Sequence, residues 1–356
     1  MNVIDVRTDT SSLPTDEMRE AMRRADVGND GFGEDPTVNR LERMAAEMLG
    51  FELGLFVSSG TMGNLLGVMA GIHRGDAILI GSRSHIALIE GYSLSQLGGI
   101  YPIQVDDSSG SPDVEEIEGI LTWRRMSERI RMVTVENTHN MRGGAAMRPG
   151  HMATFVDLVR RHHLKLHLDG ARIFNAAVAL GVDVQELTEG ADSVTFCLSK
   201  GLCAPVGSVL VSDRETIRRA RHLRNLMGGQ MRQVGVLAAA GIVALERMIP
   251  RLADDHAKAK RLAAGLSTIP GIRLTPERVE TNLVIFDVSG LGVSAAEFAK
   301  RLAEEGVLGV AFSKDEIRYA VYRDVTEEDI EPAVEITQRV AGEIGSHSKI
   351  TAEKIE

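Results

Sequence analysis

An acid and a lysine each follow an apolar, strand-like run in this chain. Asp169 ends the run LKLHLD, and Lys200 follows the run SVTFCLS. Side chains at the carboxyl ends of strands in an open α/β sheet point into the crevice where such sheets bind ligands. A lysine placed there can have its amine pKa lowered by desolvation, which imine formation with a carbonyl requires. The alternatives are a lysine that snorkels to the surface and an aspartate that only caps a helix.

These two residues suit pyridoxal 5'-phosphate (PLP). A lysine can hold this cofactor as a Schiff base, and a carboxylate beside its ring nitrogen keeps the ring protonated as an electron sink. Between Asp169 and Lys200 the sequence leaves room for one helix and one strand. The pair therefore predicts chemistry at the bonds around the Cα of an amino acid.

A third motif, VSSGTMGN, is typical of a strand, a turn of small residues and a helix N-terminus. Ser59, Gly60 and Thr61 would present backbone N–H groups and a hydroxyl to a phosphate, although a plain N-cap would have the same sequence. There is neither a GxxxxGK[ST] loop nor a GxGxxG after a strand, so ATP and dinucleotide sites lose their main support. A phosphate cradle, an acid and a lysine in this order predict a fold-type I PLP enzyme.

Two of the ten histidines fall in loops after strands, where ligand sites collect. These are His85, in SHIALIE, and His139, in ENTHN. His162, His163 and His167 lie beside or on a strand, and we expect them to be packing or surface residues.

The elements that would position these residues form an α/β chain. Residues 1–37 are expected to be an N-terminal arm and helix. In residues 38–232 helical patterns alternate with short apolar strands, which predicts a large α/β domain with a mainly parallel sheet. Residues 233–266 are expected to be a connecting helix, residues 267–346 a smaller α+β domain, and residues 347–356 a charged tail.

Composition excludes several classes of protein. The net charge is -10, and basic residues do not alternate with aromatics, which argues against a nucleic-acid partner. The basic run of residues 214–224 is expected to be a solvated helix face, with proximity to an anionic ligand as the alternative. Apolar runs are interrupted before membrane-spanning length, so no membrane partner is expected.

The two cysteines and the N-terminal segment bear on compartment. Cys197 and Cys203 have neither metal-ligand spacing nor the number of a disulfide framework. The first residues, MNVIDVRTDT, carry no export or organelle signal. We expect a cytoplasmic protein without a bound metal.

With these motifs the chain resembles the threonine aldolases of the aromatic-amino-acid β-eliminating lyase superfamily. The resemblance extends from DVRTDT to IRYAVYRDV. Its most specific stretches are VGNDGFGEDPTVNRLE, SSGTMGN, ENTHN, HLDGARIFNAAVALG, LSKGL with APVGS, and GGQMRQVGVLAAAG. It implies an aspartate-aminotransferase-type large domain and a homo-oligomer, dimer or tetramer, with active sites shared between subunits.

The resemblance implies a role for each residue that would contact the cofactor. Lys200 would form the Schiff base and Asp169 would partner the ring nitrogen. Gly60 and Thr61 would bind the phosphate, and His85 would stack on the ring.

Other residues would contact the substrate or a neighbouring subunit. Arg172 and Arg318 would hold the substrate carboxylate, with Thr8 assisting them. Arg232 would reach a phosphate, expected to be in a neighbouring subunit. Glu90 matches a family acid five residues after the stacking histidine.

The implied reaction is cleavage of an L-3-hydroxy amino acid of the threonine or allo-threonine type to glycine and an aldehyde. The base that takes the β-hydroxyl proton could be His85, His139 or a water positioned by Glu90. The alternatives are a bulkier 3-hydroxy amino acid as substrate, a β-eliminating lyase, a simple aminotransferase, and a binding subunit without catalysis.

Several positions depart from the family pattern, and they are expected to cluster where substrate choice is set. These are Ile89, Tyr92, Ser93, Cys203, Asn225, Val321 and Tyr322.

Overall fold

A computed structural model describes residues 3–123 and 128–353 of the chain. It divides into two compact units. The larger unit comprises Leu13–Met141 and Ala146–Pro250, and the smaller unit comprises Met1–Ser12, Arg142–Ala145 and Arg251–Glu356. The boundaries at Leu13 and Arg251 fall inside the segments that we expected to be the N-terminal arm with its helix and the connecting helix.

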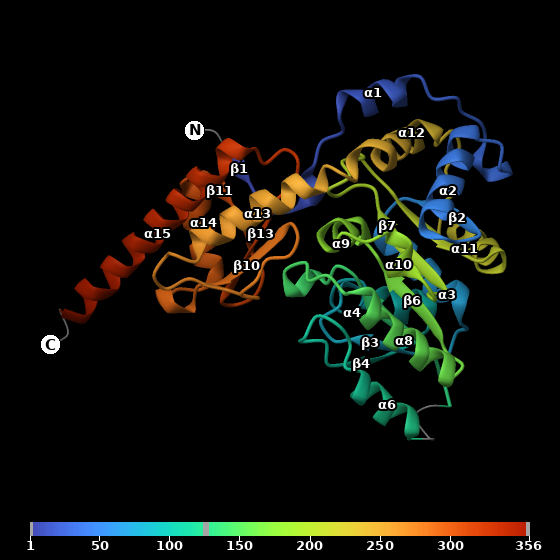
Figure 1. Cartoon of the computed structure of the whole chain (residues 1–356), viewed down its shortest axis with the longest axis horizontal. Coiled ribbons are helices and arrows are strands. Elements are labelled where there is room, and N and C mark those ends of the chain that lie inside the picture. Colours follow the sequence, from blue (N-terminus) through green and yellow to red (C-terminus); the bar gives the residue numbers. More distant parts are fainter. Residues whose placement is uncertain (1–2, 124–127, 354–356) are drawn as a thin grey trace. The chain divides into compact units, whose positions relative to one another are not determined.

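A seven-stranded sheet in the order β2-β8-β7-β6-β5-β3-β4 forms the centre of the larger unit (Figure 1). Its strands are β2 (Leu53–Val57), β3 (Ala77–Gly81), β4 (Tyr101–Val105), β5 (Ile130–Glu136), β6 (Lys165–Asp169), β7 (Ser193–Cys197) and β8 (Ser208–Ser212). The strands from β4 to β7 pair in parallel, and β8 runs antiparallel to both β7 and β2. The predicted α/β class with a mainly parallel sheet is confirmed.

The strands of this sheet are apolar because helices cover them. All residues of β3, β7 and β8 are buried, as expected for strands covered on both faces. The helices are α1 (Asp16–Arg23), α2 (Pro36–Leu49), α3 (Gly60–Gly71), α4 (His85–Leu88), α5 (Gly91–Ser93), α6 (Val114–Thr122), α8 (Pro149–Arg161), α9 (Ile173–Leu180), α10 (Val184–Thr188), α11 (Arg214–Leu226) and α12 (Gly235–Val243). Short 3-10 or π turns lie at η2 (Asp30–Phe32), η3 (Leu94–Gly98), η4 (Asn140–Arg142) and η5 (Ala244–Met248).

The smaller unit is α+β, as predicted. An antiparallel sheet in the order β12-β13-β10-β9 and a parallel pair β1-β11 pack with three helices around one apolar core. Its elements are β1 (Ile4–Asp5), η1 (Asp9–Ser11), α13 (Leu252–Leu266), β9 (Arg273–Leu274), β10 (Leu283–Asp287), η6 (Ser289–Leu291), α14 (Ala295–Glu304), β11 (Val307–Leu308), β12 (Val310–Ala311), β13 (Glu316–Ala320) and α15 (Glu327–Glu353). Helix α15 therefore continues into the segment that we expected to be a charged tail, of which residues 354–356 lie outside the described residues.

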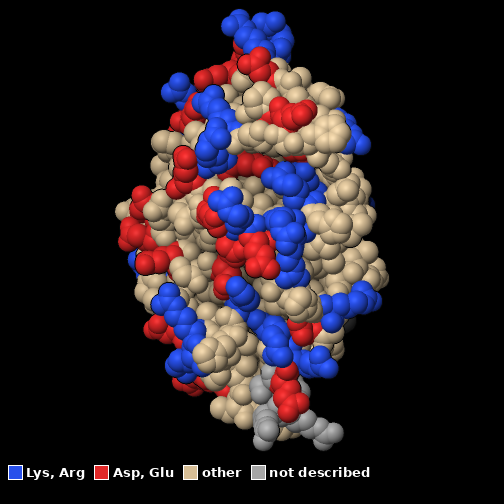
Figure 2. Space-filling model, turned by 90° about the vertical axis from the view of Figure 1, so that its right-hand side faces the viewer, with Lys and Arg blue, Asp and Glu red and all other residues tan. Residues whose placement is uncertain are grey.

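The basic run of residues 214–224 forms helix α11, and acids of the same unit pair with several of its arginines. Arg214 contacts Glu52 at 2.7 Å and Arg221 contacts Glu42 at 2.6 Å. On the side of the molecule seen in Figure 2, basic and acidic side chains are interspersed. None of the helices in the described part of the chain combines the length and the hydropathy needed to cross a membrane.

Candidate active site

Asp169 ends strand β6 and is buried. Its two carboxylate oxygens each accept a hydrogen bond. Asn64, on helix α3, donates from Nδ2 to Oδ2 at 2.9 Å, and the backbone N–H of Ala171 donates to Oδ1 at 3.0 Å. Two N–H donors, one at each oxygen, fix the orientation of this carboxyl group. The residue therefore presents its carboxyl group in a fixed orientation at the carboxyl edge of the sheet.

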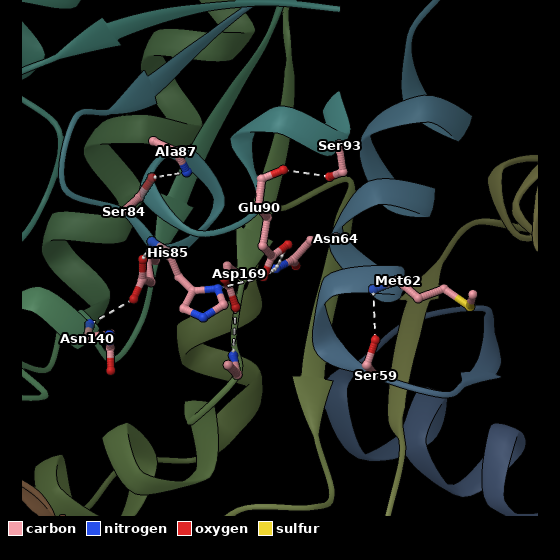
Figure 3. A network of polar contacts seen from close by, with 12 residues as sticks. Ser59, Met62, Asn64, Ser84, His85, Ala87, Glu90, Ser93, Asn140 and Asp169 are labelled. Carbon is pink, nitrogen blue, oxygen red and sulfur yellow. Dashed lines mark hydrogen bonds and ion pairs between the residues drawn. The ribbon is translucent and has the colours of Figure 1, made fainter. Parts of the chain in front are cut away.

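His85 and Glu90 come from the segment after β3 and meet Asp169. The ring Nδ1 of His85 donates to Glu90 Oε1 at 2.6 Å, and Glu90 is buried. One ligand atom from each of His85, Glu90 and Asp169 lies within 4.8 Å of the others. Figure 3 shows these side chains pointing toward one another, with Asn64 beside them. Such spacing could also hold a metal ion. In this structure, however, both oxygens of Asp169 already accept hydrogen bonds from N–H donors.

The surroundings of His85 make its ring more basic. Burial by itself lowers the pKa of His85, but the hydrogen bond to Glu90 and the charges of Asp169 and Glu90 outweigh it. The net result is a pKa above the usual value. The positive charge of Lys200 acts in the opposite direction, which places that ammonium group within electrostatic reach of the ring.

Lys200 lies in the turn that follows β7 and is half-buried. The backbone N–H of Cys203 donates to the Lys200 carbonyl at 2.8 Å and closes the turn. Cys203 adopts a φ of 64°, the left-handed conformation that glycine accommodates best. This conformation explains why glycine suits the position of Cys203. The same turn places Lys200 after the end of β7.

The N-terminus of α3 forms the other end of the site. Ser59 caps this helix by accepting a hydrogen bond from the Met62 N–H at 3.2 Å, and Thr61 is exposed. A Cβ at Gly60 would lie 2.8 Å from Cys197 Sγ, so the helix start approaches β7 more closely than a larger residue allows. Exposed N–H groups at a helix N-terminus favour an anion.

His139 makes a different contact from that of His85. Its Nε2 donates to Asp107 Oδ2 at 2.9 Å, and both side chains are at most 1% exposed. Asp107 also accepts hydrogen bonds from the Arg83 N–H at 2.9 and 3.1 Å. His139 therefore joins the loop after β5 to the end of β4.

Glu136, which we did not single out in the sequence, connects these loops. One of its oxygens accepts the His85 N–H at 2.6 Å and the other accepts the Asn140 N–H at 2.7 Å. Burial raises the pKa of Glu136, the charge of His139 lowers it, and the charge of Asp169 raises it again, with a raised value as the net result. Asn140 in turn accepts a hydrogen bond from Arg172 Nη1 at 3.3 Å.

The remaining predicted residues come from other segments of the chain. Arg232 is exposed on the larger unit. Thr8 and Arg318 belong to the smaller unit, where Thr8 caps η1 and Arg318 donates to the Arg7 carbonyl at 3.2 Å. The guanidinium of Arg318 also lies 4.9 Å from the ring centre of Phe312.

Four of the positions that depart from the family pattern fall into two groups. Ile89 and Tyr92 are exposed, at 64% and 77% of their surface, in the segment that carries His85. Val321 and Tyr322 are buried in the core of the smaller unit, and the Tyr322 hydroxyl donates to the Asp5 carbonyl at 3.1 Å. Core packing and this hydrogen bond account for the latter two residues.

Two residues around Asp169 and His85, Asn64 and Glu136, were missed by the sequence analysis, and the hydrogen bonds of a third, His167, were not anticipated. A signal was present, because they lie inside the motifs SSGTMGN, ENTHN and HLDGARIF. We expected His167 to be a packing or surface residue. It is fully buried, and it hydrogen-bonds Asn64 at 3.2 Å.

A family model for β-eliminating lyases matches residues 5–289. The chain belongs to the β-eliminating lyase family. Among the relatives of this lyase is "Low-specificity L-threonine aldolase 1" of Arabidopsis thaliana, 43% identical over 93% of this chain and 94% of the relative. A second is the "Low specificity L-threonine aldolase" of Escherichia coli K12, 41% identical over 74% of this chain and 79% of the relative.

Solved structures agree on the fold of the lyase. A threonine aldolase of Leishmania major superposes with a TM-score of 0.80 at 19% identity and covers 95% of this chain and 99% of its own. At that identity the likeness concerns the fold.

Proposed function

We propose that this lyase is a PLP-dependent aldolase that cleaves an L-3-hydroxy amino acid of the threonine or allo-threonine type to glycine and an aldehyde. The observation that carries the proposal is the cluster of His85, Glu90 and Asp169, within 4.8 Å of one another and within electrostatic reach of Lys200. The names of the relatives from Arabidopsis and Escherichia coli support the choice of substrate.

The residues present fit PLP. Asn64 contacts Asp169 from the second turn of α3, and this helix begins at Gly60. At about 1.5 Å of rise per residue, that start lies about 6 Å along the helix from Asn64, a distance comparable with one substituted pyridine ring. Asp169 would face the ring nitrogen, the start of α3 would take the phosphate, and Lys200 would supply the amine.

Bound PLP would supply the electron sink for the pair released when the Cα–Cβ bond breaks. The protein must then accept the β-hydroxyl proton. Because Glu90 accepts the Nδ1 proton of His85, Nε2 is the nitrogen that accepts a substrate proton when the ring is neutral. The His85 side chain is 31% exposed, whereas His139 is 1% exposed and bound to Asp107. We therefore assign the base to His85.

We assign the substrate carboxylate to Arg172, Arg318 and Thr8. A guanidinium pairs with a carboxylate through two parallel hydrogen bonds, and Arg172 follows Asp169 closely in the chain. Arg172 is anchored at Asn140, the residue whose N–H is bound by Glu136.

We further propose a cytoplasmic homo-oligomer in which Arg232 of one copy binds the phosphate in another. The exposure of Arg232 supports such a contact. Both cysteines are free thiols, which suits a reducing compartment.

The reaction is tested by supplying L-threonine and L-allo-threonine, with phenylserine in parallel. Glycine and an aldehyde should appear in equal amounts, and Lys200→Ala should lose both this activity and the visible band that borohydride abolishes. The family name makes β-elimination the second candidate. Ammonia and a keto acid without glycine would overturn the aldolase and leave the cofactor site standing.

A further inference from the structure

A buried chain of polar side chains lies behind Asp169. Ser193, at the start of β7, bonds His167 Nδ1 at 2.8 Å, and His167 Nε2 bonds Asn64 Oδ1 at 3.2 Å. Asn64 then donates to Asp169 Oδ2 at 2.9 Å. Figure 3 shows the last link, with Asn64 beside Asp169 and Glu90. The chain joins three elements, β7, β6 and α3, to one carboxylate.

The carboxylates decide the orientation of the Asn64 amide. Its Nδ2 lies 2.9 Å from Asp169 and 3.4 Å from both oxygens of Glu90. The flipped amide would direct its oxygen at two carboxyl groups, which repel it when ionised. Asn64 Oδ1 therefore faces His167 and needs an N–H from that ring.

The state of His167 fits this requirement. Its side chain is fully buried, and burial lowers its pKa to about 4 against an opposing effect of Asp169, so the ring is neutral at physiological pH. A neutral ring has one N–H, which Asn64 requires at Nε2. Nδ1 then accepts the hydroxyl proton of Ser193, and each polar atom of the chain has a matching partner.

Glycine makes room for this histidine beneath α3. A Cβ at Gly67 would lie 2.6 Å from Cε1 and 2.9 Å from Nδ1 of His167. Helix α3 therefore packs against the imidazole more closely than any other residue at position 67 permits. An apolar side chain at position 167 could fill the same space without hydrogen bonds, so packing alone does not require a histidine.

We propose that His167 and Ser193 are positioning residues, which hold the Asn64 amide and through it fix Asp169 against the ring nitrogen of the cofactor. This inference rests on the proposed function, because it assumes PLP beside Asp169. Under this proposal, the buried His167 influences how strongly the ring nitrogen of the cofactor holds its proton.

Two substitutions at one position separate the hydrogen bond from packing. His167→Gln can still offer an N–H near the position of Nε2, whereas His167→Leu cannot. In the PLP-loaded protein, His167→Leu should shift the pH midpoint of the visible band by about half a pH unit or more and lower kcat about tenfold, with little change in KM. His167→Gln should recover most of both effects.

Controls distinguish this role from loss of stability. Leu166→Ala, at the neighbouring buried residue of β6, should lower the melting temperature without moving the pH midpoint. A double variant of Asn64→Ala with His167→Leu should be no worse than Asn64→Ala alone, because both act through one contact.

The possible outcomes are distinct. If His167→Leu binds PLP and titrates like the wild type, or if Gln and Leu give equal effects, the proposal is wrong. Should His167→Leu fail to fold, Ser193→Ala, which removes only the hydroxyl, must give a smaller shift of the midpoint in the same direction. A wild-type protein without a PLP band would refute the proposed function itself.

Discussion

The chemistry of single residues in this site depends on the hydrogen-bond partners that their neighbours provide. Asp169 has an N–H at each oxygen, and His85 has a carboxylate at Nδ1. These contacts fix the orientation of the first side chain and, when the ring is neutral, the tautomer of the second. Substitutions that preserve shape but exchange donor for acceptor are therefore the most informative at this scale.

Asp169→Asn should retain PLP and lose most activity. An amide cannot hold the ring nitrogen protonated, and its own N–H₂ would face the donors from Asn64 or Ala171. We expect kcat to fall by more than about tenfold, or about 1.4 kcal/mol of barrier. Asp157→Asn, at an exposed acid of α8, should have normal kcat. A smaller loss in Asp169→Asn would count against its role at the ring.

His256 on α13 should make the protein sensitive to acid. Burial, and then the charges of Lys260 and Arg251, lower its pKa to about 4 in the folded state. Since the unfolded value is higher, the unfolded chain binds the proton more readily, and stability present above about pH 6.5 is lost as the pH falls toward about 4. This loss amounts to about 3 kcal/mol when complete.

The measurement compares melting temperatures at about pH 7.5 and about pH 5. His256→Gln should show a smaller drop than the wild type. His222→Gln, at an exposed histidine of α11, should show the wild-type drop. Equal drops in all three proteins would exclude His256 as a source of the acid sensitivity.

At the scale of elements, a short helix cap orients His85, the residue that we propose as the base. Helix α4 begins at His85, and Ser84 caps it by accepting the Ala87 N–H at 3.3 Å and donating to the Gly81 carbonyl at 2.8 Å. Glu136 binds the His85 N–H from β5. The direction of the His85 ring is thus set by the start of a helix only four residues long.

Ser84→Ala should reduce both stability and activity. Loss of an N-cap costs about 1 kcal/mol, and here it also loosens His85. Thr15→Ala provides the matched control, because Thr15 caps α1 by accepting the Met18 N–H at 3.1 Å. Melting temperatures should fall in both variants, whereas kcat/KM should fall only in Ser84→Ala. Parallel losses of kcat/KM would show that the cap of α4 has no special role.

At the scale of the whole molecule, the proposed contact of Arg232 with a phosphate in another copy of the chain requires an oligomer. Arg232 is exposed, and its backbone carbonyl accepts the Asp30 N–H at 3.1 Å. A phosphate contact made across subunits would leave a monomer with an incomplete site.

Mixing two inactive variants tests this arrangement. Lys200→Ala lacks the amine and Arg232→Ala lacks the phosphate contact, so each should be poorly active alone. After co-refolding, a symmetric pairing should restore about a quarter of the sites, because one site of each mixed dimer has both residues. Arg218→Ala, at an exposed arginine of α11, should behave as wild type. A fully active monomer in sedimentation, or no recovery on mixing, would contradict a shared site.

Much of the fold and the main members of the site were predictable from the sequence by itself. Apolar runs between helical patterns encode buried parallel strands locally, and small residues after a strand encode a helix start. Asp169, Lys200 and Ser59 were identifiable because each follows such a run directly. Their roles toward PLP remain predictions that the variants above test.

Only the tertiary structure decided which polar residues meet. Asn64 and His167 contact each other from α3 and β6, and Glu136 binds the first residue of α4 from β5. Such pairs depend on which strand ends lie side by side, and periodicity carries no information about that order. A histidine within a strand has the same local pattern whether it packs passively or orients an amide. The function of His167 therefore became visible only with its neighbours in place.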